Sequence, residues 1–270
     1  MGQERVVVAV DGTGSGRAAA GWAAREALWR GVPVHAVRVR RTEPSGRARA
    51  DRAVVESVRR LAAAHHELTV TLVDVIGAPV PALLAQLTPE SWLVLGTDGT
   101  GGAADTLAAD VAGRAGCPVA LVPGGILPAA DAGRTDRIAV GVDVHSPDGA
   151  ALGLAFDRAQ RTGARLRAVH AWAYPEPEAS AWPFAIPEAD RARWEDQEVQ
   201  RVCDALHPWR EKYPRVPLLL DVVRFAPAQA LIRASHHTDL LVVGRRDSRL
   251  GVTVRALMRA ARGPVVLVPH

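Results

Sequence analysis

The chain has 270 residues, of which 48% are hydrophobic, and its 33 basic and 29 acidic side chains give a formal net charge of +4. This length suits two domains that each bury a core of their own. No apolar run approaches the roughly 20 residues of a membrane span, and the polar flanks of the first apolar run lead us to expect no signal peptide. The arginines are too scattered for a nucleic-acid interface, and 2 cysteines make no disulfide framework. We therefore expect a cytoplasmic protein that binds neither membrane nor nucleic acid.

The first half alternates apolar runs with helical patterns. The β-branched run at 5–10 predicts a strand buried on both faces, and the loop after it leads into a helix at about 15–30 that stops at Gly31, a favourable C-terminal cap. The remaining predictions are strands at 33–39, 69–75, 92–96 and 118–122 and helices at 47–65, 79–88 and 103–115. This alternation predicts a parallel, doubly wound sheet.

The second half repeats the same order. After a strand at 137–142, Ser146 is the predicted N-cap, with Pro147 at the first helical position and Gly163 at the end of the helix. The remaining predictions are strands at 165–171, 217–223, 239–243 and 264–268 and a helix at about 188–211.

Self-comparison indicates a tandem duplication. The offset between matching residues is 132 near the start of each copy and 148 near its fourth strand, so the second copy carries 16 extra residues between its second and third strands. The clearest matches are RVVVAVDGT at 5–13 with RIAVGVDVH at 137–145, GVPVHAVRVR at 31–40 with GARLRAVHAW at 163–172, and SWLVLGTDG at 91–99 with DLLVVGRRD at 239–247.

The duplication divides the chain into two domains at 1–125 and 137–270. A stretch rich in Gly, Pro and Ala at 126–136 is the expected linker. The extra residues fall in a Pro-rich, aromatic segment at about 173–187, which either folds back on its own domain or offers a surface to a protein partner. The aromatic side chains of that surface would be Trp182 and Phe184.

Candidate ligand contacts lie where the buried strands end. In a doubly wound sheet, ligands bind beyond the carboxyl ends of the strands at the point where strand order reverses. Those positions carry Asp11 and Gly96 in the first copy and Asp143 and Gly244 in the second. The aspartates are suited to accept a hydrogen bond from a base amino group or, alternatively, to cap the next helix. The glycines suit either close backbone approach to a phosphate or a simple strand-to-helix turn.

These segments resemble the universal stress protein family. The resemblance rests on VVVAVDG before an alanine-rich helix, VHAW at 169–172, ALIRASHHTDLLVVG at 230–244, and the closing runs CPVALVP at 117–123 and GPVVLVP at 263–269. The resemblance appears once in each half, and the two together extend over nearly the whole chain. It implies two Rossmann-like α/β domains, each with a five-stranded parallel sheet in the order 3-2-1-4-5, paired through their last strands.

The resemblance also implies a nucleotide site. Family members that bind ATP use an Asp after strand one, here Asp11 and Asp143, and a small apolar residue at the end of strand two, here Val39 and Ala171. If ATP binds, Mg²⁺ is expected to bind with it. A third feature is a G-x2-G-x9-G-(S/T) loop after strand four, and this sequence departs from it in both copies.

The phosphate loop is shortened in each copy. The first copy keeps Gly96 and Gly99 and offers Thr106 for the closing hydroxyl, with two further loop glycines, Gly101 and Gly102. The second copy keeps Gly244, and Gly251 falls at the end of the motif. Asp98 and Asp247 bring negative charge to the phosphate path, which weakens phosphate binding. We therefore expect weak nucleotide binding, with the first copy the better candidate.

The expected function is that of a stress-response or regulatory protein and not an enzyme. Its two domains would pair within the chain, and a further homodimer is possible. No metal site is expected, because the adjacent histidine pairs point apart on their helices. The alternatives are a ligand-free dimerisation scaffold and a slow ATPase or nucleotide hydrolase.

Overall fold

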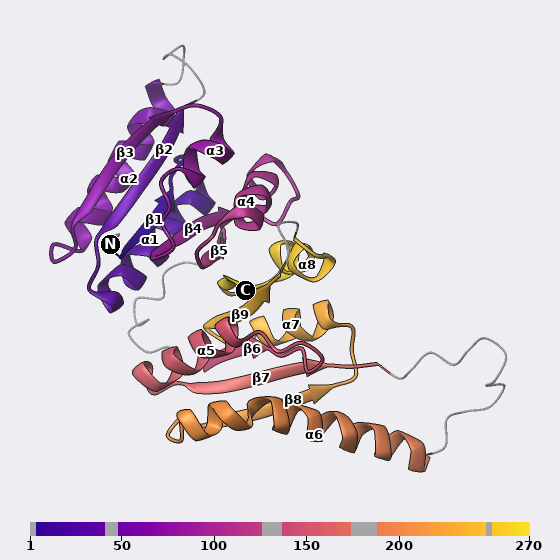
Figure 1. The fold of residues 1–270 in the computed structure, drawn as a ribbon. Helices are drawn as coiled ribbons and strands as arrows, with labels where there is room; N and C mark the ends of the chain where they lie inside the picture. The colour runs from indigo at the N-terminus through magenta and orange to yellow at the C-terminus, as the bar shows by residue number, and fades with distance from the viewer. Residues whose placement is uncertain (1–3, 41–47, 126–136, 174–187, 247–249) are drawn as a thin grey trace.

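The computed structural model describes residues 4–40, 48–125, 137–173, 188–246 and 250–270. Within these residues, ten strands form one sheet in the order β3-β2-β1-β4-β5-β10-β9-β6-β7-β8 (Figure 1). The first half holds β1 (Arg5–Ala9), α1 (Gly14–Arg30), β2 (Val34–Arg40), α2 (Ala48–Ala64), β3 (Val70–Ile76), α3 (Pro79–Leu84), β4 (Ser91–Thr97), α4 (Ala103–Arg114) and β5 (Val119–Pro123). The second half holds β6 (Arg137–Gly141), α5 (Gly149–Thr162), β7 (Arg165–Ala171), α6 (Glu188–Lys212), β8 (Leu218–Val223), α7 (Pro227–Ser235), β9 (Leu240–Arg245), α8 (Val252–Ala260) and β10 (Val265–Pro269).

Each half has the predicted strand order 3-2-1-4-5. The first half runs β3-β2-β1-β4-β5, and the second runs β8-β7-β6-β9-β10. Pairing within each half is parallel, whereas β5 and β10 pair antiparallel and join the halves into one sheet. The expected pairing of the two domains through their last strands is therefore present.

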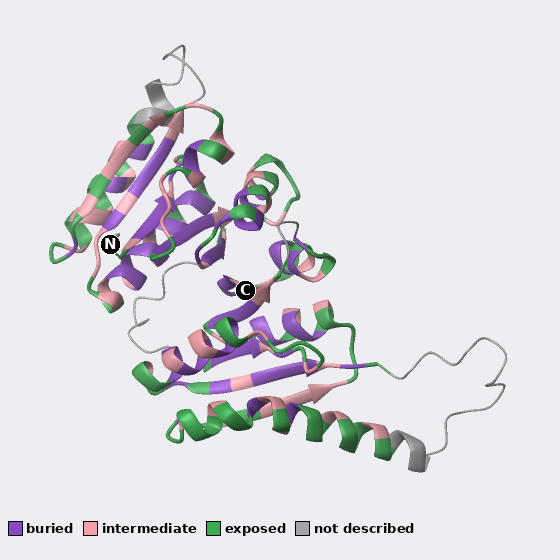
Figure 2. Ribbon diagram, viewed as in Figure 1, coloured by how far each residue is buried: buried purple, intermediate pink, exposed green. Residues whose placement is uncertain are grey.

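The helices cover both faces of the sheet, and both cores cross the boundary between the halves. One apolar cluster joins the inner sides of α1, α2, α5 and α6 to one face of the strands. A second joins α3, α4, α7 and α8 to the other face. Figure 2 shows the buried residues concentrated on the central strands and on the inward sides of the helices. Because each cluster contains residues of both halves, the halves share a core on each face of the sheet.

Most predicted element boundaries are confirmed within a few residues, and one helix start and one helix end need correction. Gly31 and Gly163 end α1 and α5 in the left-handed conformation, each with φ of 70°, as predicted. Ser146 and Pro147 were wrong as the start of α5, because Asp148 is the N-cap and its carboxylate accepts from the first amides of the helix. The helix predicted at 79–88 is also shorter and ends at Leu84.

Part of the extra length of the second copy lies in a longer helix. α6 has 25 residues where its counterpart α2 has 17. The expected linker at 126–136 and nearly all of the segment at 173–187, with Trp182 and Phe184, lie outside the described residues. Among the residues that are described, no helix is long and apolar enough to cross a membrane.

Candidate functional site

The second half contains a cleft of about 550 Å³ at the carboxyl ends of β6, β7 and β9. Three predicted contacts, Asp143 after β6, Ala171 at the end of β7 and Gly244 in β9, all line it. Strand order reverses between β6 and β9, so the cleft lies at the position where a doubly wound sheet binds its ligands. The structure thus brings together predicted residues from three separate strands.

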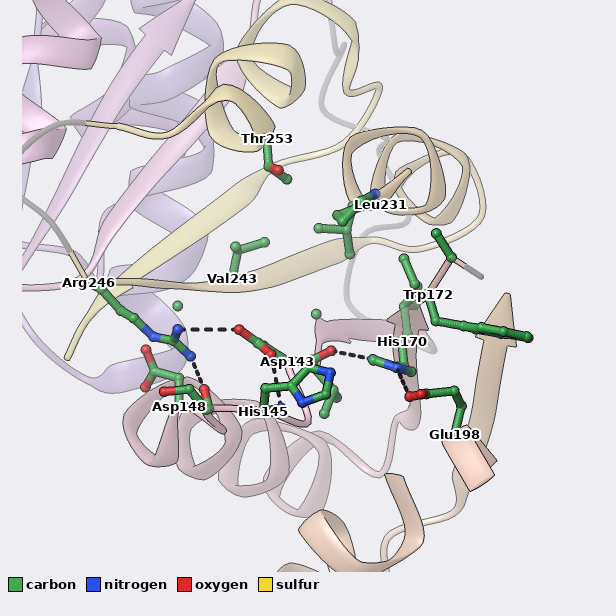
Figure 3. A pocket seen from close by; sticks show the side chains of 18 residues that line it. Asp143, His145, Asp148, His170, Trp172, Glu198, Leu231, Val243, Arg246 and Thr253 are labelled. Atoms are coloured by element: carbon green, nitrogen blue, oxygen red, sulfur yellow. Dashed lines mark hydrogen bonds and ion pairs between the residues drawn. The ribbon is translucent and has the colours of Figure 1, made fainter. Parts of the chain in front are cut away.

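The cleft has an apolar wall and a charged mouth (Figure 3). Leu231 of α7, Val243 of β9 and the buried Trp172 supply apolar surface. At the mouth, Arg246 lies 3.3 Å from a carboxylate oxygen of Asp143 and also donates to a backbone carbonyl of the loop before α5. This combination of apolar walls with a few convergent polar groups is typical of small-molecule sites.

A buried histidine on β7 forms the side of the cleft toward α6. The Nδ1 atom of His170 lies 3.0 Å from the carbonyl oxygen of Val142, and its Nε2 atom lies 3.1 Å from the carboxylate of Glu198. Glu198 also pairs with Arg201, one turn further along α6. The pair connects the long helix to the sheet and places a carboxylate in the cleft wall (Figure 3).

Sequence reasoning missed this pair. His170 was part of the VHAW segment, but its partner lies 28 residues further along the chain, beyond the insertion. A polar side chain inside a buried strand was the available signal, because such a group needs a partner.

The cleft of the first half is much smaller, at about 140 Å³. Asp11, Val39 and Gly96 line it, as predicted, with Leu83 and Leu107 among their neighbours. The four remaining predicted contacts do not line it: Gly99, Gly101, Gly102 and Thr106. The sequence predicted that this half is the better nucleotide site, whereas the larger cleft lies in the second half.

The glycine-rich loop of the first half bonds to the protein itself. Asp105, only 5% exposed, accepts hydrogen bonds from the backbone amides of Asp98 at 3.0 Å and Gly101 at 2.8 Å. Thr106 donates its hydroxyl proton to the carbonyl of Gly102 at 3.0 Å. Groups that the motif would direct at a phosphate therefore already have partners.

The same loop packs against the second half. A Cβ atom placed on Gly99 would lie 3.0 Å from the carbonyl oxygen of Arg259 in α8, and the φ of Gly99 is 73°. Asp98 is fully exposed beside it, and hydrogen bonds from Thr100 hold the pKa of that carboxyl below its usual range. A carboxylate therefore stays charged here at neutral pH.

Gly96 and Gly244 have a packing role. A Cβ atom on Gly96 would lie 2.5 Å from the carbonyl oxygen of Ser15 at the start of α1. A Cβ atom on Gly244 would overlap the carboxylate of Asp148, the N-cap of α5. Each glycine lies inside the fourth strand of its half and lets the first helix of that half approach the strand, a packing role that neither the phosphate nor the strand-to-helix-turn alternative described.

The aspartates after the first strands are not helix caps. Thr13 is the N-cap of α1, and Asp11 accepts from the amide of Thr13 at 2.9 Å and from its hydroxyl at 2.6 Å. Asp143 accepts from the amide of His145 at 3.0 Å. The helix-cap reading of both aspartates was wrong, and both side chains remain exposed beside their clefts.

The start of α8 faces the cleft of the second half. Gly251 is its N-cap and offers no side-chain acceptor, while Thr253 lines the cleft (Figure 3). A helix N-terminus carries partial positive charge and unpaired amides, which favour an anion. Gly251 itself is not among the residues that line the cleft.

Comparison with known proteins assigns the chain to a family. A family model described as "Universal stress protein family" matches it twice, over residues 3–123 and 134–269. The chain belongs to the universal stress protein family. Universal stress protein Rv2005c of Mycobacterium tuberculosis is 30% identical over 293 residues, which cover 98% of this chain and 97% of that protein. Universal stress protein Rv1996 of the same organism is 28% identical over 305 residues, which cover 97% and 94%.

The tandem architecture also has a solved counterpart. The crystal structure of a universal stress protein from Archaeoglobus fulgidus superposes with a TM-score of 0.68 and covers 100% of this chain and 99% of that one, at 14% identity. This likeness confirms the two-domain α/β fold.

Proposed function

We propose that this chain is a regulatory protein of the stress response that binds an adenine nucleotide in the cleft of its second half. One observation carries the proposal: Asp143, Ala171 and Gly244 line a single cleft at the switch point of the sheet. The family resemblance independently assigns these three positions to the nucleotide.

Cavity size supports the second half over the first. Ligand sites for molecules of nucleotide size measure about 300–1,000 Å³, and the second cleft, at about 550 Å³, lies in this range. The first cleft, at about 140 Å³, lies below it. The apolar wall of Trp172, Val243 and Leu231 suits an aromatic base, and the start of α8 suits a phosphate.

Charge favours a ligand with few phosphates. The lining includes the carboxylates of Asp143, Asp148 and Glu198 against the guanidinium of Arg246. A like-charge contact at about 4 Å costs about 1 kcal/mol in bulk water and about 4 kcal/mol at an effective dielectric near 20. We therefore expect a monophosphate to bind more tightly than ATP, and Mg²⁺ to matter only for the triphosphate.

The proposed role is binding and not catalysis. The observation that favours the alternative, a slow nucleotide hydrolase, is the pair of His170 and Glu198 in the cleft wall. Both ring nitrogens of His170 already have partners, so the ring would have to release one to accept a proton from water. A ligand-free scaffold is the remaining alternative, and titration separates it from both.

A thermal-shift and calorimetric titration of the full chain with AMP, ADP and ATP, with and without Mg²⁺, tests the proposal. At a ligand concentration of about 100 Kd, binding adds about 2.7 kcal/mol, which raises Tm by about 5 °C for a chain of this size. Turnover of each nucleotide is followed in the same samples, and release of phosphate or nucleoside would favour the hydrolase.

Asp143→Ala and Asp11→Ala form a matched pair, because the two residues occupy equivalent positions of the repeat. We expect Asp143→Ala to weaken AMP binding at least tenfold and Asp11→Ala to leave it within about twofold, since one good hydrogen bond to a charged group is worth about 1.5–3 kcal/mol. The reverse pattern would move the ligand to the first half. Absence of any shift with all three nucleotides would refute nucleotide binding.

A further inference from the structure

Glu26 and Arg158 occupy the same position in the two copies of the repeat. The offset of 132 relates them without a gap, since matching segments lie on both sides of each residue. Both lie on the helix after the first strand, five residues before its capping glycine, Gly31 or Gly163. The duplication therefore carries an acid at this position in one copy and a base in the other.

The two copies are related by an approximate two-fold axis that passes through the central strands. Residues 117–123 match 263–269 with an offset of 146, so Ala120 and Val266 are equivalent, and these two residues pair with each other. The flanking pairs exchange equivalent positions: Val119 with Leu267 and Leu121 with Val265. Near such an axis, a residue faces its own equivalent in the other half.

Glu26 and Arg158 meet in this way. The Nη1 atom of Arg158 donates to both carboxylate oxygens of Glu26, at 2.7 and 2.6 Å. The side chains are 1% and 10% exposed. Arg30 donates to the same carboxylate at 2.7 Å, and the guanidinium of Arg158 lies 4.0 Å from the ring centre of Trp29. The pair is thus buried, charged and enclosed by the interface of the two halves.

We propose that this pair makes the interface specific for one first copy and one second copy. Two first copies joined in the same way would bring two buried Glu26 carboxylates together, and two second copies would bring two Arg158 guanidinium groups together. Breaking a buried ion pair leaves a buried charge without compensation, which is strongly destabilising. Like charges across an interface reject the wrong partner even where the rest of the surface fits.

The residues around the pair follow the same asymmetry. Arg30 has Thr162 as its equivalent, so a pairing of two second copies would lack this cation and its carboxylate partner. A second contact is also one-sided: Arg245 donates to the carbonyl oxygens of Gly113 at 2.6 Å and of Ala115 at the end of α4. Its equivalent in the first copy is Thr97, whose short, buried side chain has no guanidinium to reach these carbonyl groups.

Charge reversal in the full chain tests the proposal. Arg158→Glu gives the interface two acids, as in a pairing of first copies, and Glu26→Arg gives it two bases, as in a pairing of second copies. We expect each variant to lower Tm by about 10 °C. The control is Arg161→Glu on the same helix, which breaks an exposed pair with Asp157, where the side chains are 65% and 42% exposed, and should lower Tm by about 2 °C at most.

The exchange variant Glu26→Arg/Arg158→Glu distinguishes pairing from a general intolerance of substitution. If the two residues select each other across the axis, the exchange variant should regain at least half of the decrease in Tm that the less stable single variant shows relative to the wild type. Recovery of less than half would overturn the proposal. So would single variants whose Tm matches that of Arg161→Glu.

Discussion

The two halves of the molecule carry the same strands and helices and yet hold clefts of about 140 and 550 Å³. The first half keeps more of the loop glycines, and the second has the shorter loop. In the first half, the loop is bonded to Asp105 and packed against Arg259 of α8. The number of glycines in a phosphate-type loop therefore says little about the space that the loop encloses, since the same amides can serve an internal carboxylate.

Equivalent positions on the second strand show the same divergence. Arg38 in β2 corresponds to His170 in β7. Arg38 pairs with Asp74 on the neighbouring edge strand β3, at 2.5 Å, whereas His170 reaches Glu198 on the long helix α6. Helix α6 thus contributes a carboxylate to the wall of the second cleft, whereas Arg38 pairs with the neighbouring strand of its own sheet.

Among contacts within each half, the largest effect should come from the glycines that pack the first helices against the fourth strands. Gly96→Ala should cost about 3 kcal/mol of unfolding free energy, because its Cβ would press on the backbone carbonyl of Ser15. Gly244→Ala should cost about 2 kcal/mol, because turning the Asp148 carboxylate away removes the cap and still leaves the Cβ of Asp148 2.8 Å from the new methyl group. Urea unfolding measures both variants.

Gly116→Ala is the control for this pair, since nothing lies within 4 Å of its Cβ position. We expect its stability to stay within about 0.5 kcal/mol of the wild type. If Gly96→Ala behaved like this control, the close approach of α1 to β4 would be wrong.

A second prediction concerns the glycine-rich loop of the first half, whose backbone amides donate to Asp105. Asp105→Ala should destabilise the protein by about 2 kcal/mol, because it leaves the amides of Asp98 and Gly101 without their acceptor. Hydrogen exchange should show faster exchange at these two amides. Unchanged exchange there would mean that Asp105 does not hold the loop.

The smallest effect is a pH dependence in the first half. Bonds and charge from Arg38 hold the pKa of Asp74 below its usual range. The ion pair therefore stabilises the fold above the ordinary aspartate pKa of about 4, and this contribution is lost as pH falls through the lowered pKa. Because the Asp74 side chain is 37% exposed, Asp74→Asn should cost less than about 1 kcal/mol at pH 7.

The check on this prediction is stability measured between pH 7 and pH 2. The difference between the wild type and Asp74→Asn should shrink as the pH falls. A difference that grew toward acid would contradict the direction of the pKa shift.

The fold was predictable because duplication and strand–helix alternation constrain it strongly. The blocks around Asp11 and Asp143 located the first strands, and the capping glycines located the helix ends. The site was predictable in part: Asp143 and Gly244 follow from the strand ends, and Ala171 follows from the family resemblance. The partner of His170 was not, because Glu198 lies beyond an insertion that has no counterpart in the first copy. Nor was the role of Asp105, since the bonds of a loop carboxylate depend on the path of the loop.

Photoaffinity labelling of the full chain with 8-azido-AMP, followed by peptide mapping, tests the central claim most directly. The claim is that the nucleotide binds in the cleft of the second half. It predicts labelled peptides around Trp172 or Leu231, which line that cleft, and protection by excess AMP. Protected labelling confined to peptides around Val39 or Leu83, which line the first cleft, would contradict it.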